Sequence, residues 1–402
     1  MSINMFMEKQ KKHIVLVNTW RVVQSKGGTE RVFCDLANEL VLMGYQVTAL
    51  CCEKKIGRPG FLLLPQVEFV NAYRKKKLHE KAYKLLKCFS FFGKARDVKR
   101  RIFGLNWVAK ILNEQICKLN QVDLFIAFQP ESSYFLLKGG QNRKVITMFH
   151  FSPDVLFAKK NFEYIKDFVV RSRALTVLLP SYIEIVREKL PSCPPVICIP
   201  NAIHNFPKKS PLTGNKIVCL ARLSQQKRVD LLLRAFFLIK DRFKGWIIDY
   251  WGEIDVEPKY KDEMFKLRDR LGLRGRFNFN GQTSDIESVL NSASIFVLPS
   301  KFEGFSLALG EAMSKGVPVI CCIDCQGMNE IVVDGSNGFL VEPTPEALAH
   351  ALELVMTNQD LKIKLGTKAK EDISNYYPEK VWGKWNSLIK CILNENTSNN
   401  VL

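Results

Sequence analysis

Short apolar runs recur along the whole chain, and longer segments with apolar residues at helical spacing separate them. In the first half these runs predict strands at 13–20, 46–52, 67–71, 123–128, 144–148, 174–179 and 196–199. In the second half they predict strands at 216–220, 246–250, 276–280, 294–298, 317–322 and 338–341. Strands that alternate with helices are typical of parallel sheets covered by helices. We therefore predict an α/β protein with two Rossmann-like domains and a terminal helix at 375–391.

The domain organisation follows from length and composition. A chain of 402 residues exceeds what one core usually fills, and 47% apolar residues suffice for two cores. We place the domains at 1–200 and 201–375, followed by a C-terminal segment at 376–402. No apolar run is long enough to span a bilayer as a helix. Twelve cysteines, several of them within strand-like runs, favour a reducing compartment.

A strand–loop–helix–strand unit at 294–322 carries the candidate chemistry. Ser306 suits the N-cap of its helix and Gly316 suits the residue that ends it. The first amides of such a helix have no internal partner, so they suit a phosphate. Glu303 in the loop and Glu311 on the helix are expected roughly 10 Å apart along the axis, at ~1.5 Å per residue. Because carboxylates bind hydroxyls and repel phosphate, this spacing suits a nucleotide sugar.

The pattern F-E-G-F-x-x-x-x-x-E-A-M-x-x-G-x-P-V runs without a gap from Phe302 to Val319. It resembles the E-x7-E signature of the retaining glycosyltransferases of family four. That resemblance implies the GT-B fold, with two Rossmann-like domains facing across a cleft and a C-terminal helix that returns to the N-domain. It also implies that the first domain binds the acceptor and the second binds the nucleotide-diphosphate sugar. The residues that it assigns to the donor are Gly27, Gly28, Arg222, Lys227, Gly281, Glu303, Gly304, Phe305, Ser306 and Glu311.

The same resemblance implies a division of roles. Arg222 and Lys227 match the family's R-x4-K pair, and both cations would meet the diphosphate. His150 follows a predicted strand, at the place where the family often has a histidine near the transferred sugar. The expected catalytic residues are therefore His150, Arg222, Lys227 and Glu303. Front-face attack with retention is implied, in which the leaving phosphate takes the acceptor proton. The segment 324–330 is a further candidate for contact with the sugar.

We expect no cofactor beyond the donor substrate, a UDP-sugar or a GDP-sugar, and no metal in the chemical step. The nearest sequence to a metal-binding D-x-D is Glu253-Ile254-Asp255, which lacks a matching context. The pair Cys322 and Cys325 forms a lone CxxC, which is weak support for zinc. Arg222, Lys227 and the amides at 304–307 can instead stabilise the charge that develops on the leaving group.

The net charge of +19 is concentrated in the first half, where residues 1–200 hold 33 basic and 16 acidic residues. Residues 74–110 alone hold 13 Lys and Arg against two acids, interleaved with aromatic and aliphatic residues, within a helical insertion at about 74–118. This composition is typical of a helix in an anionic membrane interface. The alternative is a solvated insertion that packs on its own domain. No motif supports nucleic-acid binding. We expect a cytoplasmic protein, peripheral on the inner face of the plasma membrane, that acts on a glycan or lipid-linked acceptor in cell-surface polysaccharide assembly.

Two other functions stay open at this point. A sugar-nucleotide 2-epimerase of GT-B fold would keep the diphosphate cations, but it should carry several acid–base residues in its ligand loops. A non-catalytic scaffold of a glycan assembly complex would not need Glu303, Glu311, Arg222 and Lys227 together.

Overall fold

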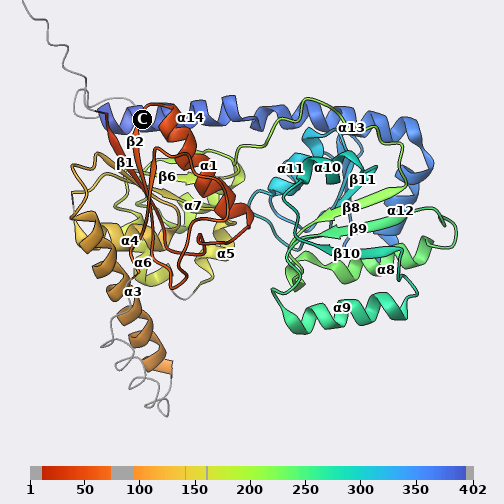
Figure 1. Cartoon of the computed structure of the whole chain (residues 1–402), viewed down its shortest axis with the longest axis horizontal. Coiled ribbons are helices and arrows are strands. Elements are labelled where there is room, and N and C mark those ends of the chain that lie inside the picture. The colour runs from red at the N-terminus through yellow and green to blue at the C-terminus, as the bar shows by residue number, and fades with distance from the viewer. Residues whose placement is uncertain (1–10, 74–93, 141, 160–161, 395–402) are drawn as a thin grey trace, which may run out of the picture. The chain divides into compact units, whose positions relative to one another are not determined.

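The computed structural model describes residues 11–73, 94–140, 142–159 and 162–394. The chain forms two compact units (Figure 1). Unit 1 consists of Met1–Ile199 and Lys384–Leu402, and unit 2 of Pro200–Gly383. The sequence places the division after residue 200 and starts the last segment at 376. Each unit is described below by itself.

Unit 1 contains a parallel sheet of seven strands in the order β3-β2-β1-β4-β5-β6-β7. Its strands are β1 (His13–Asn18), β2 (Gln46–Cys51), β3 (Val67–Asn71), β4 (Leu124–Ala127), β5 (Val145–Met148), β6 (Ala174–Val177) and β7 (Val196–Cys198). Every residue of β1, β4, β5 and β6 is buried, as expected of strands covered on both faces. The Rossmann-like prediction for this half is confirmed.

Among the described residues of unit 1, the helices are α1 (Gly28–Leu42), α3 (Lys94–Ile116), α4 (Pro130–Gly139), α5 (Pro153–Phe157), α6 (Phe162–Val169), α7 (Ser181–Lys189) and the later part of α14 (Pro378–Asn394). Helices α3, α4 and α6 pack together on one side of the sheet (Figure 1). The basic stretch at 74–110 lies partly outside the described residues, which resume at α3. Within the described ranges, no helix is both long and apolar enough to cross a membrane.

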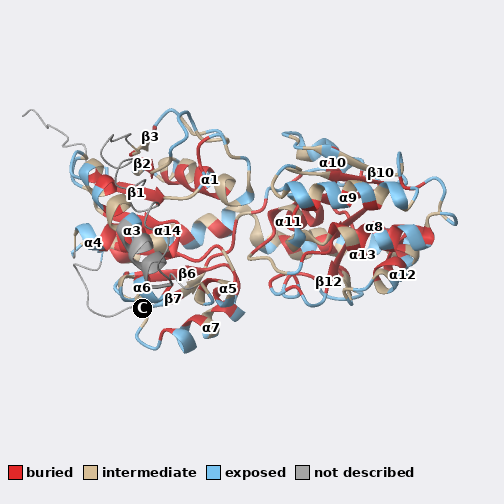
Figure 2. Ribbon diagram, turned by 90° about the horizontal axis from the view of Figure 1, so that it is seen from below, coloured by how far each residue is buried: buried red, intermediate tan, exposed pale blue. Residues whose placement is uncertain are grey.

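Unit 2 contains a parallel sheet of six strands in the order β10-β9-β8-β11-β12-β13. Its strands are β8 (Lys216–Leu220), β9 (Ile247–Trp251), β10 (Phe277–Gly281), β11 (Ile295–Leu298), β12 (Val319–Cys322) and β13 (Gly338–Val341). Its helices are the 3-10 turn η1 (Gln225–Lys227), α8 (Val229–Ile239), α9 (Pro258–Arg270), α10 (Ile286–Asn291), α11 (Leu307–Ser314), α12 (Pro345–Thr357), α13 (Gln359–Ile373), the 3-10 turn η2 (Ser374–Tyr376) and the start of α14. In both units the central strands are buried, whereas β3, β7, β10 and β13 are partly accessible, and the outward faces of the helices are exposed (Figure 2).

Two predicted elements differ in their ends. The first strand is predicted to reach residue 20 but ends at Asn18, because the chain turns where the Asn18 side chain accepts a hydrogen bond from the Trp20 amide (2.9 Å). Lys227 is predicted at the start of a helix but lies in η1, since Arg228 adopts a left-handed conformation before α8 begins. The other strands match the predicted ranges to within two residues at each end.

Candidate active site

Helix α11 begins as the sequence predicts, with Ser306 as its N-cap. The Ser306 hydroxyl accepts a hydrogen bond from the Leu309 amide (3.3 Å), and the amides before Leu309 have no acceptor within the helix. The Phe305 ring is buried against Tyr376, with ring centroids 5.2 Å apart, so only the backbone of Phe305 is suited to a ligand. Glu311 is buried on α11. The helix start therefore presents amides next to a packed aromatic residue.

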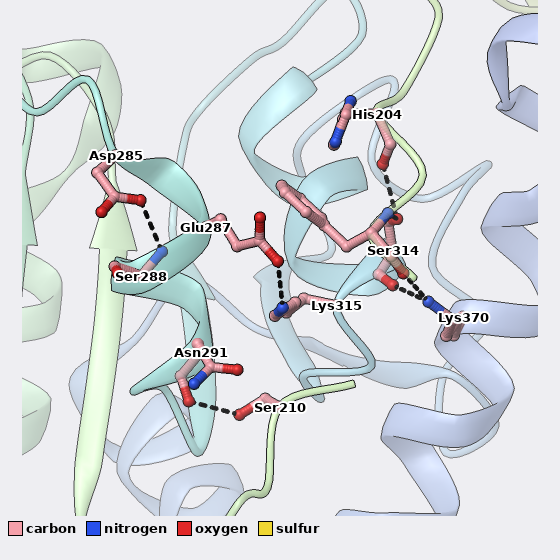
Figure 3. A network of polar contacts seen from close by, with 10 residues as sticks. His204, Ser210, Asp285, Glu287, Ser288, Asn291, Ser314, Lys315 and Lys370 are labelled. Carbon is pink, nitrogen blue, oxygen red and sulfur yellow. Dashed lines mark hydrogen bonds and ion pairs between the residues drawn. The ribbon is translucent and has the colours of Figure 1, made fainter. Parts of the chain in front are cut away.

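The C-terminal end of α11 is anchored by the polar network in Figure 3. Buried Lys315 donates from Nζ to Glu287 on α10 (2.9 Å). The Ser314 hydroxyl donates to the His204 carbonyl oxygen (2.7 Å), and Lys370 on α13 donates to the Ser314 carbonyl oxygen (2.7 Å). Burial lowers the pKa of Lys370. These contacts fix the end of the helix that carries Glu311, and they use backbone oxygens that the helix itself cannot pair.

Lys227 and Glu303 form an ion pair, with Lys227 Nζ 2.5 Å from Glu303 Oε1. Their side chains are only 12% and 11% exposed. Two further contacts join the same loops: the Lys301 amide donates to the Gln226 carbonyl (2.8 Å), and Gln226 Nε2 donates to the Phe302 carbonyl (2.6 Å). The resemblance counts Lys227 and Glu303 among both the donor-binding and the catalytic residues, and the structure places the two side chains in direct contact.

Arg222 lies just past the end of β8, and its side chain is exposed. Among the described residues, the Arg222 guanidinium has no hydrogen-bond or ion-pair partner, whereas its carbonyl accepts from the Tyr250 hydroxyl (3.0 Å). Gly252 packs so closely that a Cβ there would lie 1.8 Å from the Ala221 oxygen. The Gly252 amide donates to the carbonyl of Gly281, which ends β10 at φ +75° (2.7 Å). Unit 2 thus offers an available cation at the carboxyl end of β8, five residues before the paired Lys227.

Arg228, directly after Lys227, was not singled out by the sequence. It holds φ at +48°, which is costly for a residue other than glycine. Its guanidinium bonds both oxygens of Asp324, at 2.8 and 2.6 Å, and this contact lowers the pKa of the Asp324 carboxyl. We call this pair the Arg228–Asp324 clamp. It joins the C-cap of η1 to the loop after β12, and it engages the first residue of the segment 324–330, the further candidate for contact with the sugar.

We expect Asp324→Asn to lower kcat/KM for transfer about tenfold, because a neutral amide holds the Arg228 fork less firmly and Lys227 then loses its fixed position. The double exchange Arg228→Asp with Asp324→Arg should recover part of the loss, since aspartate tolerates a positive φ. Steady-state kinetics with a varied donor concentration measures the loss in the single variant and the recovery in the double exchange.

The control for this experiment is Asp269→Asn, which weakens a similar Arg274–Asp269 pair at the protein surface. That variant should keep the wild-type kcat/KM. A wild-type value for Asp324→Asn, or no recovery in the double exchange, would contradict a positioning role for the clamp.

In unit 1, the candidate residues of the glycine loop lie at the start of α1. Gly27 is the N-cap and Gly28 the first helical residue. The Glu30 carboxylate folds over Gly27, where an added Cβ would meet it at 2.2 Å, and it accepts a hydrogen bond from the Ser25 hydroxyl (2.9 Å). Because a flexible side chain can move away, the close contact does not by itself require glycine at 27.

His150 follows β5 and is buried, with its ring tilted against Phe128 at 4.0 Å between centroids. Its Nε2 atom has no hydrogen-bond partner within the part of the chain that the structure describes. Burial lowers the pKa of His150 to about 3, so the imidazole is neutral at physiological pH. A neutral ring at this strand end can exchange a hydrogen bond with a ligand hydroxyl, but it supplies no positive charge.

The low pKa of His150 predicts a measurable pH dependence of stability. The unfolded state takes up a proton near pH 6.5 and the folded state only near pH 3, so this contribution is complete above pH 6.5 and is lost as the pH falls. Compared with His150→Asn, the wild-type free energy of unfolding should fall by about 1.4 kcal/mol more for each pH unit below about 6. Urea denaturation across this range measures the difference.

The exposed His350 on α12 provides the control for that experiment. His350→Asn should keep the wild-type slope of stability against pH. Equal slopes for the wild type and His150→Asn would show that His150 titrates normally in the folded state.

The structure also locates the residues that the sequence offers as possible metal ligands. The described residues contain no group of three or more histidine, cysteine or carboxylate side chains that could hold a metal ion. Cys322 and Cys325 are buried, and burial raises the pKa of the Cys322 thiol to about 11. Such thiols are protonated at neutral pH and are poor metal ligands.

The chain is similar to known glycosyltransferases in sequence. Residues 202–372 match the family described as glycosyl transferases group 1. An uncharacterized glycosyltransferase of Haemophilus influenzae is 25% identical over 91% of this chain and 97% of its own length. The poly(ribitol-phosphate) alpha-N-acetylglucosaminyltransferase of Staphylococcus aureus is 29% identical over 189 residues. That match covers 46% of this chain and 37% of the relative.

A solved structure has the same fold over nearly the whole chain. The S. aureus enzyme TarM, crystallised as a mutant with fondaparinux, α-GlcNAc-glycerol and UDP, superposes with a TM-score of 0.74. The match covers 96% of this chain and 100% of that one, at 16% identity. The chain therefore carries a glycosyl transferases group 1 domain over residues 202–372 and is a glycosyltransferase of the GT-B fold.

Proposed function

We propose that the protein transfers a sugar from a UDP-sugar or a GDP-sugar, with retention, to a glycan or lipid-linked acceptor in cell-surface polysaccharide biosynthesis. The observation that carries this proposal is that the segment after β8 in unit 2 holds both the available Arg222 guanidinium and Lys227, which is paired with Glu303. A diphosphate can bind Arg222 as a fork and share the Lys227 ammonium with Glu303. Glu303 can then accept a hydrogen bond from a sugar hydroxyl.

The chemistry follows from where charge develops. As the bond between the sugar and the phosphate oxygen breaks, negative charge grows on the diphosphate. Arg222, Lys227 and the amides at the start of α11 stabilise that charge where it forms. The leaving phosphate takes the proton of the acceptor hydroxyl as the new glycosidic bond forms on the same face. His150, neutral in unit 1, holds a hydroxyl by a hydrogen bond.

The acceptor is proposed from the charge of unit 1 and from the relatives. Residues 1–200 carry a large excess of basic residues, which suits an anionic acceptor or an acceptor in an anionic membrane. One relative acts on poly(ribitol-phosphate), and TarM was crystallised with UDP and a GlcNAc-glycerol. We place the protein on the cytoplasmic face of the plasma membrane, where a lipid-linked glycan would be available.

Hydrolysis and transfer assays with a panel of UDP- and GDP-sugars test the proposal. We expect one nucleotide sugar to be consumed far faster than the others, with release of the nucleoside diphosphate. Interconversion of epimers without release of free sugar would favour a 2-epimerase. Binding without turnover of any donor would favour a scaffold.

We expect activity to persist in EDTA, because in the proposed site two protein cations and the α11 amides would stabilise the charge that other transferases stabilise with a metal ion. The measurement is the initial rate after dialysis against EDTA, with and without added Mn²⁺. A rate that falls to background in EDTA and returns with Mn²⁺ would disprove metal independence. Addition of Mg²⁺ to the untreated enzyme serves as the control for effects of ionic strength.

A further inference from the structure

Two loops of unit 1 meet at the carboxyl ends of β1 and β2 and form one surface, which we call the cationic rim: residues 21–28 and 54–62. The Gln24 amide donates to the Arg58 carbonyl (3.0 Å), and the Gly60 amide donates back to a carbonyl of the first loop (3.2 Å). A Cβ at Gly60 would lie 2.0 Å from another backbone oxygen of that loop, so glycine permits this close packing. Backbone hydrogen bonds and close backbone packing therefore hold the two loops of the rim together.

Large apolar side chains project from the rim and its edge into solvent. Ile56 is 89% exposed and Leu62 is 80% exposed. The Leu62 carbonyl accepts a hydrogen bond from Asn38 on α1 (3.0 Å), and Leu42, 71% exposed, lies one turn further along that helix. Because the hydrogen bonds hold this loop in place, the exposure of Ile56 and Leu62 belongs to the folded structure. Exposed apolar groups that are gathered in one segment mark an interaction site more often than singly scattered ones do.

All charged residues of the rim are basic. Its exposed cations are Arg21, Lys26, Lys54, Lys55 and Arg58. None of them forms an ion pair with another described residue. Glu53, beside the second loop, is turned to the backbone, where its carboxylate accepts from the Val22 and Val23 amides. The two loops of the rim thus carry both exposed cations without an ion pair among the described residues and two exposed aliphatic side chains.

We propose that the cationic rim docks unit 1 on the surface of an anionic lipid bilayer. Ile56 and Leu62 would enter the boundary between head groups and acyl chains, while the cations contact lipid phosphates. Aliphatic side chains would gain nothing from the phosphates of a nucleic acid, which favours a bilayer as the partner. The proposal rests on the proposed function, because it adds the surface that brings a membrane-borne acceptor to the protein. His150 lies at the same carboxyl edge of the parallel sheet.

Sedimentation with lipid vesicles tests the rim. Wild-type protein should bind vesicles that contain about 30% phosphatidylglycerol and should not bind vesicles of pure phosphatidylcholine. The bound protein should dissociate from the anionic vesicles at ~0.5 M salt. Lys54→Gln, Lys55→Gln and Arg58→Gln together should lower the partition coefficient roughly 100-fold, at about fivefold for each charge. Ile56→Ser with Leu62→Ser should lower it about tenfold or more, and should leave its salt dependence unchanged.

Controls separate the rim from the rest of the proposed function. Leu238→Ser with Ile363→Ser removes exposed apolar groups from unit 2 and should bind vesicles like the wild type. Every rim variant should still hydrolyse the donor at the wild-type rate. Normal vesicle binding by the rim variants would overturn the proposal that the rim docks on the bilayer. If charge reversal in the basic stretch at 74–110 then removes binding, membrane docking belongs to that stretch instead; the residues to reverse are Lys75, Lys76, Lys77, Lys99, Arg100 and Arg101. Wild-type protein that ignores anionic vesicles, or prefers RNA to them, overturns the proposal while the donor assay still stands.

Discussion

Lys227→Ala is expected to lower kcat/KM for sugar transfer roughly 10²-fold or more, which corresponds to about 3 kcal/mol of transition-state stabilisation. The variant removes one of the two cations that we propose to stabilise the developing charge. It also leaves the nearly buried Glu303 carboxylate without the ammonium 2.5 Å away, so a negative charge then faces the diphosphate. Arg222→Ala should cost somewhat less, because the exposed Arg222 has no carboxylate partner among the described residues. Steady-state kinetics of both variants shows which of the two loses more kcat/KM.

The double variant Lys227→Ala with Glu303→Gln separates the two effects. If the Glu303 carboxylate adds to the loss once Lys227 is gone, the double variant should keep a higher kcat/KM than the two single losses together predict. Lys301→Ala, an exposed lysine in the same loop, is the control and should be near wild type. Near-normal kcat/KM in both Lys227→Ala and Arg222→Ala would rule out their role at the diphosphate.

Gly252→Ala is expected to lower the free energy of unfolding by roughly 3 kcal/mol or more. Gly252 has φ +147°, and a Cβ would lie 1.8 Å from the Ala221 oxygen and 2.5 Å from the Ala221 carbonyl carbon. Backbone atoms cannot move aside as a side chain can, so the loop that carries Arg222 must shift. Urea denaturation should therefore show a lower midpoint, and donor turnover should fall with it.

Gly275→Ala is the matched control, since Gly275 also has a positive φ (+75°) but nothing within 4 Å of its Cβ position. It should cost only about 1 kcal/mol, the backbone penalty without the clash. Equal losses of stability for the two variants would mean that the contact with Ala221 does not restrain the loop.

The sequence predicts the sheets well because each buried strand is a local apolar run. It also predicts the start and end of α11, where Ser306 and Gly316 act through near neighbours. The contacts within the site are different, because they join residues that are distant in the chain. Lys227 and Glu303 are 76 residues apart, and Arg228 and Asp324 are 96 apart.

A motif assigns each of those side chains a role toward a ligand, but it contains no information on which of them bond one another. The left-handed Arg228 illustrates the limit most clearly. Propensity alone would place glycine or asparagine at such a φ, whereas here an ion pair with another loop accompanies it. Only the three-dimensional arrangement of η1 and the loop after β12 reveals the clamp.

Helix α14 has a consequence for how the protein is made. It starts in unit 2, yet its residues from Lys384 onward belong to unit 1, where Leu388, Ile389 and Ile392 are buried. Lys144 also donates to the Ile392 carbonyl (2.8 Å). On the ribosome, unit 1 is therefore synthesised first but completed last, after all of unit 2 has emerged. A nascent first unit would expose the apolar surface that α14 covers, and would need protection from aggregation until then.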